Sequence, residues 1–158
     1  MHKACLFGDT KIVEMLIEAT VQVYGQEMVE RLLSTEDIEG NTPLLLAVEG
    51  GSPEIARERD RTRRKLHVSK SSHPRGENGY EWKLELKEKS HARSRRLLLR
   101  YPVNIDHENR NKMRALHLAA KIGNYDNVKL LLGKNATINC RNNNHRTPMM
   151  MAWEGNVH

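Results

Sequence analysis

The sequence predicts an all-α solenoid of short helix-turn-helix repeats, interrupted once, and three observations predict it. Segments 42–51, 114–123 and 147–155 share one pattern of residues. The step between the starts of the second and third segments, from 114 to 147, equals a repeat period of about 33 residues, which is typical of solenoids whose unit is a turn and two helices. The step from 42 to 114 is more than twice as long. The longer step therefore predicts an insert within an otherwise regular array.

The N-terminal stretch predicts a partial repeat over 1–17 and an extended helical connector over 18–36. The stretch from Ile17 to Thr42 is longer than the equivalent stretch from Leu132 to Thr147. Apolar residues in the extra segment keep helical spacing, which predicts a lengthened or an additional helix there. They are Tyr24, Met28, Val29, Leu32 and Leu33.

The rest of the chain divides at the shared pattern. We expect one repeat over 37–56 plus 96–106, split by an insert at 57–95, a second repeat over 107–139, and a truncated repeat over 140–158. Thr42-Pro43 and Thr147-Pro148 predict helix starts, because proline fits the first helical position and threonine caps it. Connecting turns resembling β-hairpins are expected between the repeats.

These segments resemble the ankyrin repeat family. The family pattern Thr-Pro-Leu-His-Leu-Ala-Ala is matched by the segments that begin at Thr42, Arg114 and Thr147. The family's turn glycine is present only as Gly40, and Lys112 and His145 stand in its place elsewhere. The Thr–His pair of the family is complete in no repeat. We therefore expect an array less stable than an idealised one.

The insert carries the whole basic excess of the chain. It holds thirteen Lys and Arg and six Asp and Glu, a net +7 in a chain whose net charge is +6, so the remainder carries −1. Its middle, 69–79, is rich in Ser, Pro, Gly and Asn, which predicts disorder, while 80–94 fits a helical extension of the segment at 97–99. Three interpretations stay open: a gene-model artefact, a solvated loop, or a basic clamp for nucleic acid, acidic lipid or an import receptor. The clamp residues are Arg59, Arg61, Arg63, Arg64 and Lys65.

No pattern in the sequence predicts catalysis, a metal site or a cofactor. The eight histidines form no His-x-x-x-His motif, and Gly50-Gly51 is not followed by the Lys-Ser/Thr of a phosphate loop. The two cysteines, Cys5 and Cys140, lie in different repeats and favour a reducing cytoplasmic compartment. No apolar run approaches the roughly 20 residues that span a bilayer.

The sequence instead predicts a non-enzymatic module that binds other proteins through a concave surface of inner helices and polar turn tips. The candidate contact residues at the tips are Glu39, Asn41, Asn109, Lys112, Arg141, Asn143 and His145. The aromatic-free, acid-interrupted basic run disfavours nucleic acid as a partner. Binding of nucleic acid or acidic lipid by the insert remains a second alternative.

The chain begins and ends within repeats, which predicts a fragment of a longer protein. Segments 39–44, 114–123 and 138–153 are also similar to the cytoplasmic N-terminal array of TRPA-type transient receptor potential channels. That resemblance implies a homotetrameric cation channel with a sensory role and a location on the cytoplasmic side of a membrane. It identifies no reactive cysteine in this chain.

Overall fold

The computed structural model of the protein describes residues 1–50 and 91–155. Its named helices are α1 (His2–Phe7), α2 (Thr10–Tyr24), α3 (Gln26–Ser34), α4 (Pro43–Gly50), α7 (Ala115–Ile122), α8 (Tyr125–Leu132) and α9 (Pro148–Gly155). Residues 91–98 are also helical. Across these ranges the structure contains no strand, as an all-α solenoid requires. The basic run from Arg59 to Lys65 lies outside the described residues, so its role stays a prediction.

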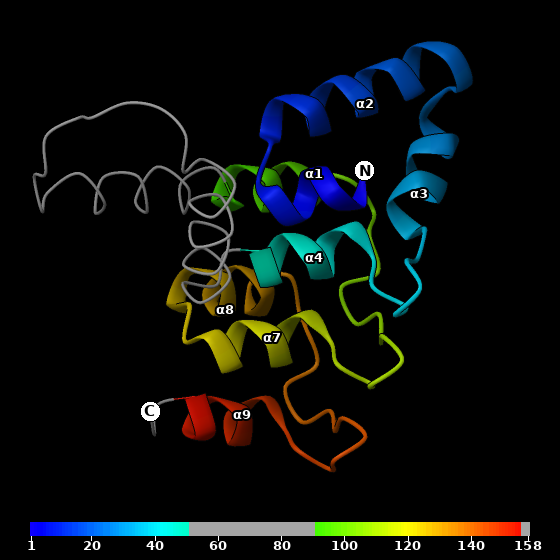
Figure 1. Ribbon diagram of the computed structural model, residues 1–158. Coiled ribbons are helices and arrows are strands. Elements are labelled where there is room, and N and C mark those ends of the chain that lie inside the picture. Colours follow the sequence, from blue (N-terminus) through cyan, green and yellow to red (C-terminus); the bar gives the residue numbers. More distant parts are fainter. Residues whose placement is uncertain (51–90, 156–158) are drawn as a thin grey trace, which may run out of the picture.

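The helices form two layers. The inner layer is the stack of α1, α4, α7 and α9, each in contact with the next (Figure 1). The outer layer consists of α2, residues 91–98 and α8, and α1 contacts α2 just as α7 contacts α8. Helices α1 and α7 thus each pair with the outer helix that follows them in sequence. This arrangement is the stacked helix-turn-helix unit that the repeat period predicts.

Apolar side chains fill the space between the layers in two clusters. The first joins α1, α2, α3, α4 and residues 91–98 through Cys5, Val13, Val29, Leu44 and Leu98, among others. The second joins α4, α7 and α8 and includes Val48, Leu116 and Leu131. Helix α4 belongs to both clusters, and all of its residues except Glu49 are buried. It is therefore the central element of the described array.

The N-terminal connector contains both a longer helix and an extra one. Helix α2 continues through Tyr24, where Gly25 (φ 80°) breaks it, and α3 follows. Val29 and Leu33 of α3 are buried in the first cluster, whereas Tyr24 is 69% exposed. Two of the five apolar residues that keep helical spacing in this connector, Val29 and Leu33, therefore lie in the core.

The last residues of the expected insert belong to the outer helix of the repeat. Residues 91–95 are helical, as the expected extension over 80–94 allows, and His91, Ser94 and Arg95 are buried. Arg95 donates from Nη1 to the carbonyl of Ala47 at 3.1 Å, and the hydroxyls of Ser94 and Thr10 are 3.0 Å apart. These contacts fix residues 91–98 as the outer helix of this repeat. The segment 51–56, expected to begin that helix, lies outside the described residues.

The three turn positions singled out by the repeat pattern all have left-handed backbone. Gly40 has φ 77°, Lys112 has φ 53° and His145 has φ 57°. Residues with a Cβ are disfavoured in this region by about 1–2 kcal/mol. The family glycine is thus replaced at two positions where its conformation is still required, which gives a physical basis for an array below ideal stability.

Replacing Lys112 by glycine is expected to stabilise the protein. Lys112→Gly removes the Cβ strain and increases the entropy of the unfolded chain, so we expect a net gain of about 0.5 kcal/mol in the free energy of unfolding, measured by urea denaturation. Gly40→Ala is the matched opposite change and should destabilise the protein. Its Cβ would lie 3.1 Å from the Arg110 backbone nitrogen, and φ at this position is positive. Destabilisation by Lys112→Gly would contradict this account.

Candidate interaction surface

The same hydrogen-bond pattern between an Asp or Asn side chain and the backbone recurs in all three turn tips. The side-chain Oδ1 of Asp37, of Asn109 and of Asn142 each accepts two backbone N–H groups, from the residues two and four positions later, at 2.8–3.0 Å. An Asp or Asn that bonds its own following backbone stabilises a tight turn. All three tips therefore share one conformation, although only one contains the turn glycine.

The tips bond to one another along the stack. The Arg110 N–H donates to the carbonyl of Glu39 at 3.0 Å, and the Asn143 N–H donates to that of Asn111 at 3.1 Å. Side-chain amides repeat the link, because Asn109 donates from Nδ2 to Asn41 and Asn143 donates to the carbonyl of Arg110. The tips are thus a continuous, ordered edge.

The predicted contact residues divide into two groups on this edge. Glu39, Lys112, Arg141 and His145 are exposed, as a contact surface requires. Asn41 is only 3% exposed and its side chain bonds within and between tips. The side chain of Asn109 holds its own turn. Asn143 is exposed but bonded to Arg110. The structure therefore gives these three asparagines a structural role.

Asp37 and Asn142 were missed by the sequence reasoning, although a signal for them exists. Asp37, Asn109 and Asn142 stand in one register with the starts of the shared pattern at 42, 114 and 147. Comparing the loops in that register would have found them.

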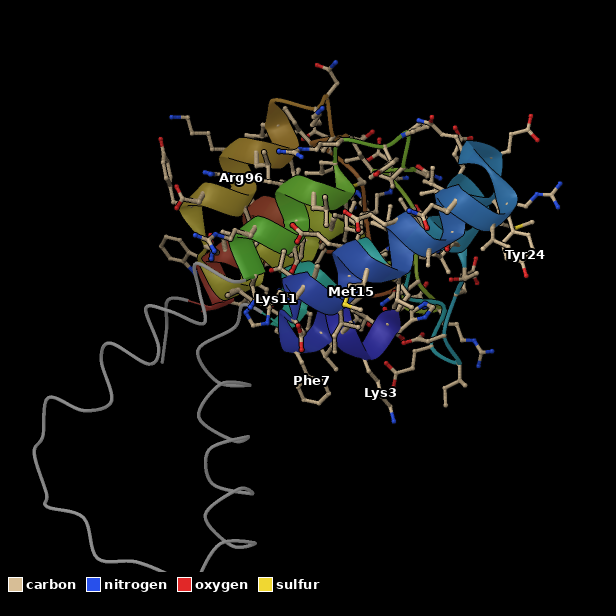
Figure 2. The ribbon with its side chains drawn as sticks, turned by 90° about the horizontal axis from the view of Figure 1, so that it is seen from above. Lys3, Phe7, Lys11, Met15, Tyr24 and Arg96 are labelled. Atoms are coloured by element: carbon tan, nitrogen blue, oxygen red, sulfur yellow. The ribbon has the colours of Figure 1, made fainter. Side chains whose placement is uncertain are left out.

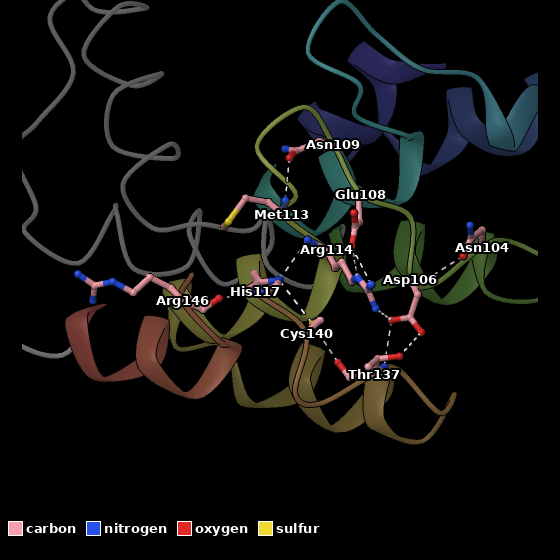
Figure 3. Close-up of polar contacts among 10 residues, drawn as sticks. All are labelled: Asn104, Asp106, Glu108, Asn109, Met113, Arg114, His117, Thr137, Cys140 and Arg146. Carbon is pink, nitrogen blue, oxygen red and sulfur yellow. Dashed lines mark hydrogen bonds and ion pairs between the residues drawn. The ribbon is translucent and has the colours of Figure 1, made fainter. Parts of the chain in front are cut away.

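Histidines bond to backbone carbonyls in the tips and beside them. His117 is buried, and its Nε2 lies 3.0 Å from the carbonyl of Arg146, while its Nδ1 accepts the Arg114 N–H at 3.2 Å (Figure 3). A carbonyl accepts only, so these partners require the neutral ring with the proton on Nε2. His2 and His107 make the same kind of contact, with the carbonyls of Thr35 and Gly40. His2 and His117 occupy the histidine position of the repeat pattern.

An ion-pair network ties one tip to the following loop. Arg114 pairs with Glu108 at 2.7 Å and with Asp106 at 3.5 Å, and Asp106 accepts both the backbone N–H and the hydroxyl of Thr137 (Figure 3). Burial alone would raise the pKa of Asp106, but the Thr137 hydrogen bonds and the Arg114 charge hold that pKa below its usual value. Arg114 stands where the pattern has threonine. It supports the turn through charge instead of through a hydroxyl cap.

The stability of the array should fall as the pH drops below about 6.5. Burial lowers the pKa of His117 from 6.5, so the unfolded chain takes up the proton first and the neutral ring of the folded state is lost at lower pH. We expect the free energy of unfolding, from urea melts at pH 7.5, 6.5 and 5.5, to decrease below 6.5. His117→Gln keeps a donor near Nε2 and should flatten this dependence. An unchanged slope in that variant would rule out His117 as its source.

The two thiols are unsuited to nucleophilic chemistry. Burial raises the pKa of Cys5 to about 12, and burial also raises that of Cys140. The thiol of Cys140 is directed to the carbonyl of Thr137 at 3.2 Å. Among residues 1–50 and 91–155, no cluster of three or more His, Cys, Asp or Glu side chains could hold a metal ion. None of the described helices combines the length and apolarity needed to cross a bilayer.

The tip geometry and the two-layer stack are those of a known repeat. Residues 88–158 match the family model described as ankyrin repeats (3 copies). This part of the chain consists of ankyrin repeats. The match starts before 91–95, in agreement with the buried contacts of that segment in the ankyrin array. An ankyrin array is a protein-interaction module, which agrees with an exposed, ordered tip edge.

Part of the chain is also similar to a cation channel protein. The "Transient receptor potential cation channel subfamily A member 1 homolog" of Caenorhabditis elegans is 46% identical over 55 residues. The matched stretch is 35% of this chain and 4% of that protein. The similarity therefore concerns a small part of a much longer relative.

Proposed function

We propose that this chain is a non-enzymatic ankyrin module that binds a protein partner across its tip edge and inner helices. The observation that carries the proposal is the hydrogen-bonded row of tips, because a preformed edge loses little entropy when a partner binds. Glu39, Lys112, Arg141 and His145 project from this edge with mixed charge. Such a surface favours a partner segment that carries both acidic and basic groups.

Photocrosslinking tests this surface. A photoreactive amino acid at position 39 or 141 should capture one defined protein from cells that express the full chain, whereas the same group at Arg31, an exposed position in the last turn of α3 and outside the tip loops, should not. Purified partner should then bind Lys112→Ser/Arg141→Ser about tenfold more weakly. Equal capture from position 31, or unchanged affinity of the double variant, would contradict the proposal.

We infer as a second candidate that the module belongs to the cytoplasmic ankyrin array of a TRPA-type cation channel. The 46% identity to the nematode relative favours it. The exposed apolar side chains of α9 also support it. Met149 and Trp153 of α9 are 80% and 78% exposed, whereas Leu116, at the position of Met149 in α7, is 3% exposed. A following repeat would cover α9 as α9 covers α7.

The full-length transcript tests the channel proposal. We expect further repeats of about 33 residues and then several apolar stretches of about 20 residues, each long enough to span a membrane. The translated protein should then assemble as a tetramer with this module on the cytoplasmic side. A complete transcript that encodes neither feature would exclude the channel and leave the interaction module untouched. The same transcript shows whether residues 57–95 are retained.

A further inference from the structure

A pocket of about 400 Å³ lies on the outer layer of the array, between residues 91–98 and α8. Its volume is within the range of small-molecule sites, which is roughly 300–1,000 Å³. Arg95, Arg96, Lys129 and Lys134 line it, together with one carboxylate, Asp126. The described residues of the lining therefore carry a net charge of +3. Figure 2 shows Arg96 beside α8, away from the tips.

The repeat register places two of these cations next to each other. Arg96 and Lys129 are one repeat period apart in the sequence and so occupy the same position on successive outer helices. Helices packed in this way are about 8–10 Å apart, and like charges at that distance repel. In the ranges that the structure describes, no carboxylate lies within ion-pair distance of Arg96, Lys129 or Lys134. An anion between them would remove the repulsion.

A buried donor in the pocket wall points to the same conclusion. Asn127 lines the pocket and is 1% exposed, and its side-chain Nδ2 has no hydrogen-bond acceptor. Its backbone N–H is satisfied by the Asn124 side chain, so the buried donor without an acceptor is the side-chain amide. A buried donor without an acceptor is unfavourable and is rare in folded proteins. A bound oxyanion would supply the missing acceptor.

We propose that this pocket binds a phosphate-bearing ligand. The guanidinium of Arg96 and the ammonium groups of Lys129 and Lys134 pair with the phosphate oxygens, and the Asn127 amide donates a hydrogen bond to one of them. Arginine offers a planar fork that matches phosphate, and lysine adds point charges, which together favour a doubly charged group over a single carboxylate. The described residues that line the site are separate from the tip edge.

Calorimetric titration of the full chain with inorganic pyrophosphate tests the pocket. We expect saturable binding that weakens about tenfold in Arg96→Gln and in Lys129→Gln. Lys121→Gln is the matched control, because this exposed cation lies on α7 outside the pocket and should leave the affinity unchanged. Absence of saturable binding at millimolar pyrophosphate, or equal weakening by Lys121→Gln, would overturn the proposal.

Asn127→Leu separates ligand binding from folding. It removes the unsatisfied donor and keeps the branching at Cγ with a larger side chain, so we expect cooperative urea unfolding to be retained together with about tenfold weaker pyrophosphate binding. Unchanged pyrophosphate affinity in this variant would overturn the proposal.

Vesicles identify the source of the phosphate. Sedimentation with phosphatidylcholine vesicles that contain a bisphosphorylated phosphatidylinositol, competed by pyrophosphate and lost in Lys129→Gln, indicates a lipid headgroup. Pyrophosphate binding without such sedimentation indicates a soluble ligand. Sedimentation that Lys129→Gln leaves unchanged and pyrophosphate does not compete would contradict a headgroup in this pocket.

Discussion

Gly50→Ala is expected to destabilise the protein by about 3 kcal/mol. A Cβ at this position would lie 2.2 Å from the carbonyl oxygen of Leu6 and 2.9 Å from Nε2 of His91. The first of these atoms belongs to the backbone of α1, so the clash is relieved only if α1 and α4 move apart. That movement also stretches the 3.1 Å contact between His91 and the Leu6 carbonyl. Overpacking of this kind typically costs about 1–3 kcal/mol, and here the contact is with backbone.

Urea denaturation of the purified variant measures this effect, and Gly133→Ala is its control. Gly133 has helical backbone with φ −63°, and a Cβ there would lie 3.3 Å from the Lys129 carbonyl. We expect the control variant to change the free energy of unfolding by less than about 0.5 kcal/mol. If Gly50→Ala behaved like Gly133→Ala, the close approach of α1 and α4 would be wrong.

Leu98→Ala should cost about 3 kcal/mol as well, by leaving a cavity. Leu98 is completely buried in the cluster that joins α1, α2, α4 and residues 91–98. Removing the side chain loses its burial and leaves a space that the surrounding helices cannot fill, for which leucine-to-alanine changes cost about 2–5 kcal/mol. The effect should appear as a lower urea midpoint with an unchanged slope.

Leu132→Ala is the matched control for this prediction. Leu132 ends the neighbouring outer helix α8 and is 40% exposed, so its truncation should cost under about 1 kcal/mol. The comparison tests whether residues 91–98 are the outer helix of the split repeat. Similar small effects of both variants would mean that this helix does not pack as the structure shows.

Much of the fold could be predicted from residues that are close in sequence. The helix starts at Pro43 and Pro148 and the left-handed turns at Gly40, Lys112 and His145 follow from one periodic pattern. Local backbone preferences and a single repeat register suffice for them, because each repeat contacts only its neighbours. The same register could have revealed the turn residues Asp37 and Asn142.

The candidate site was only half predictable. Exposure of Glu39 and Arg141 agrees with the prediction of a polar tip edge, but burial of Asn41 does not follow from its position in a polar turn. Asn41 is buried because the next tip stacks on it and Asn109 bonds to it. The pocket between residues 91–98 and α8 was not predicted, because its cations come from two helices whose facing sides are fixed by packing.

The sequence by itself determined the period, the all-α repeat class and the turn positions, since these depend on spacing and on local conformation. Only the tertiary structure decided that residues 91–95 pack as part of an outer helix. Their place rests on contacts of His91, Ser94 and Arg95 with Leu6, Thr10 and Ala47, which are 48 to 85 residues away. Contacts between residues so distant in sequence leave no periodic pattern in the sequence from which they could be predicted.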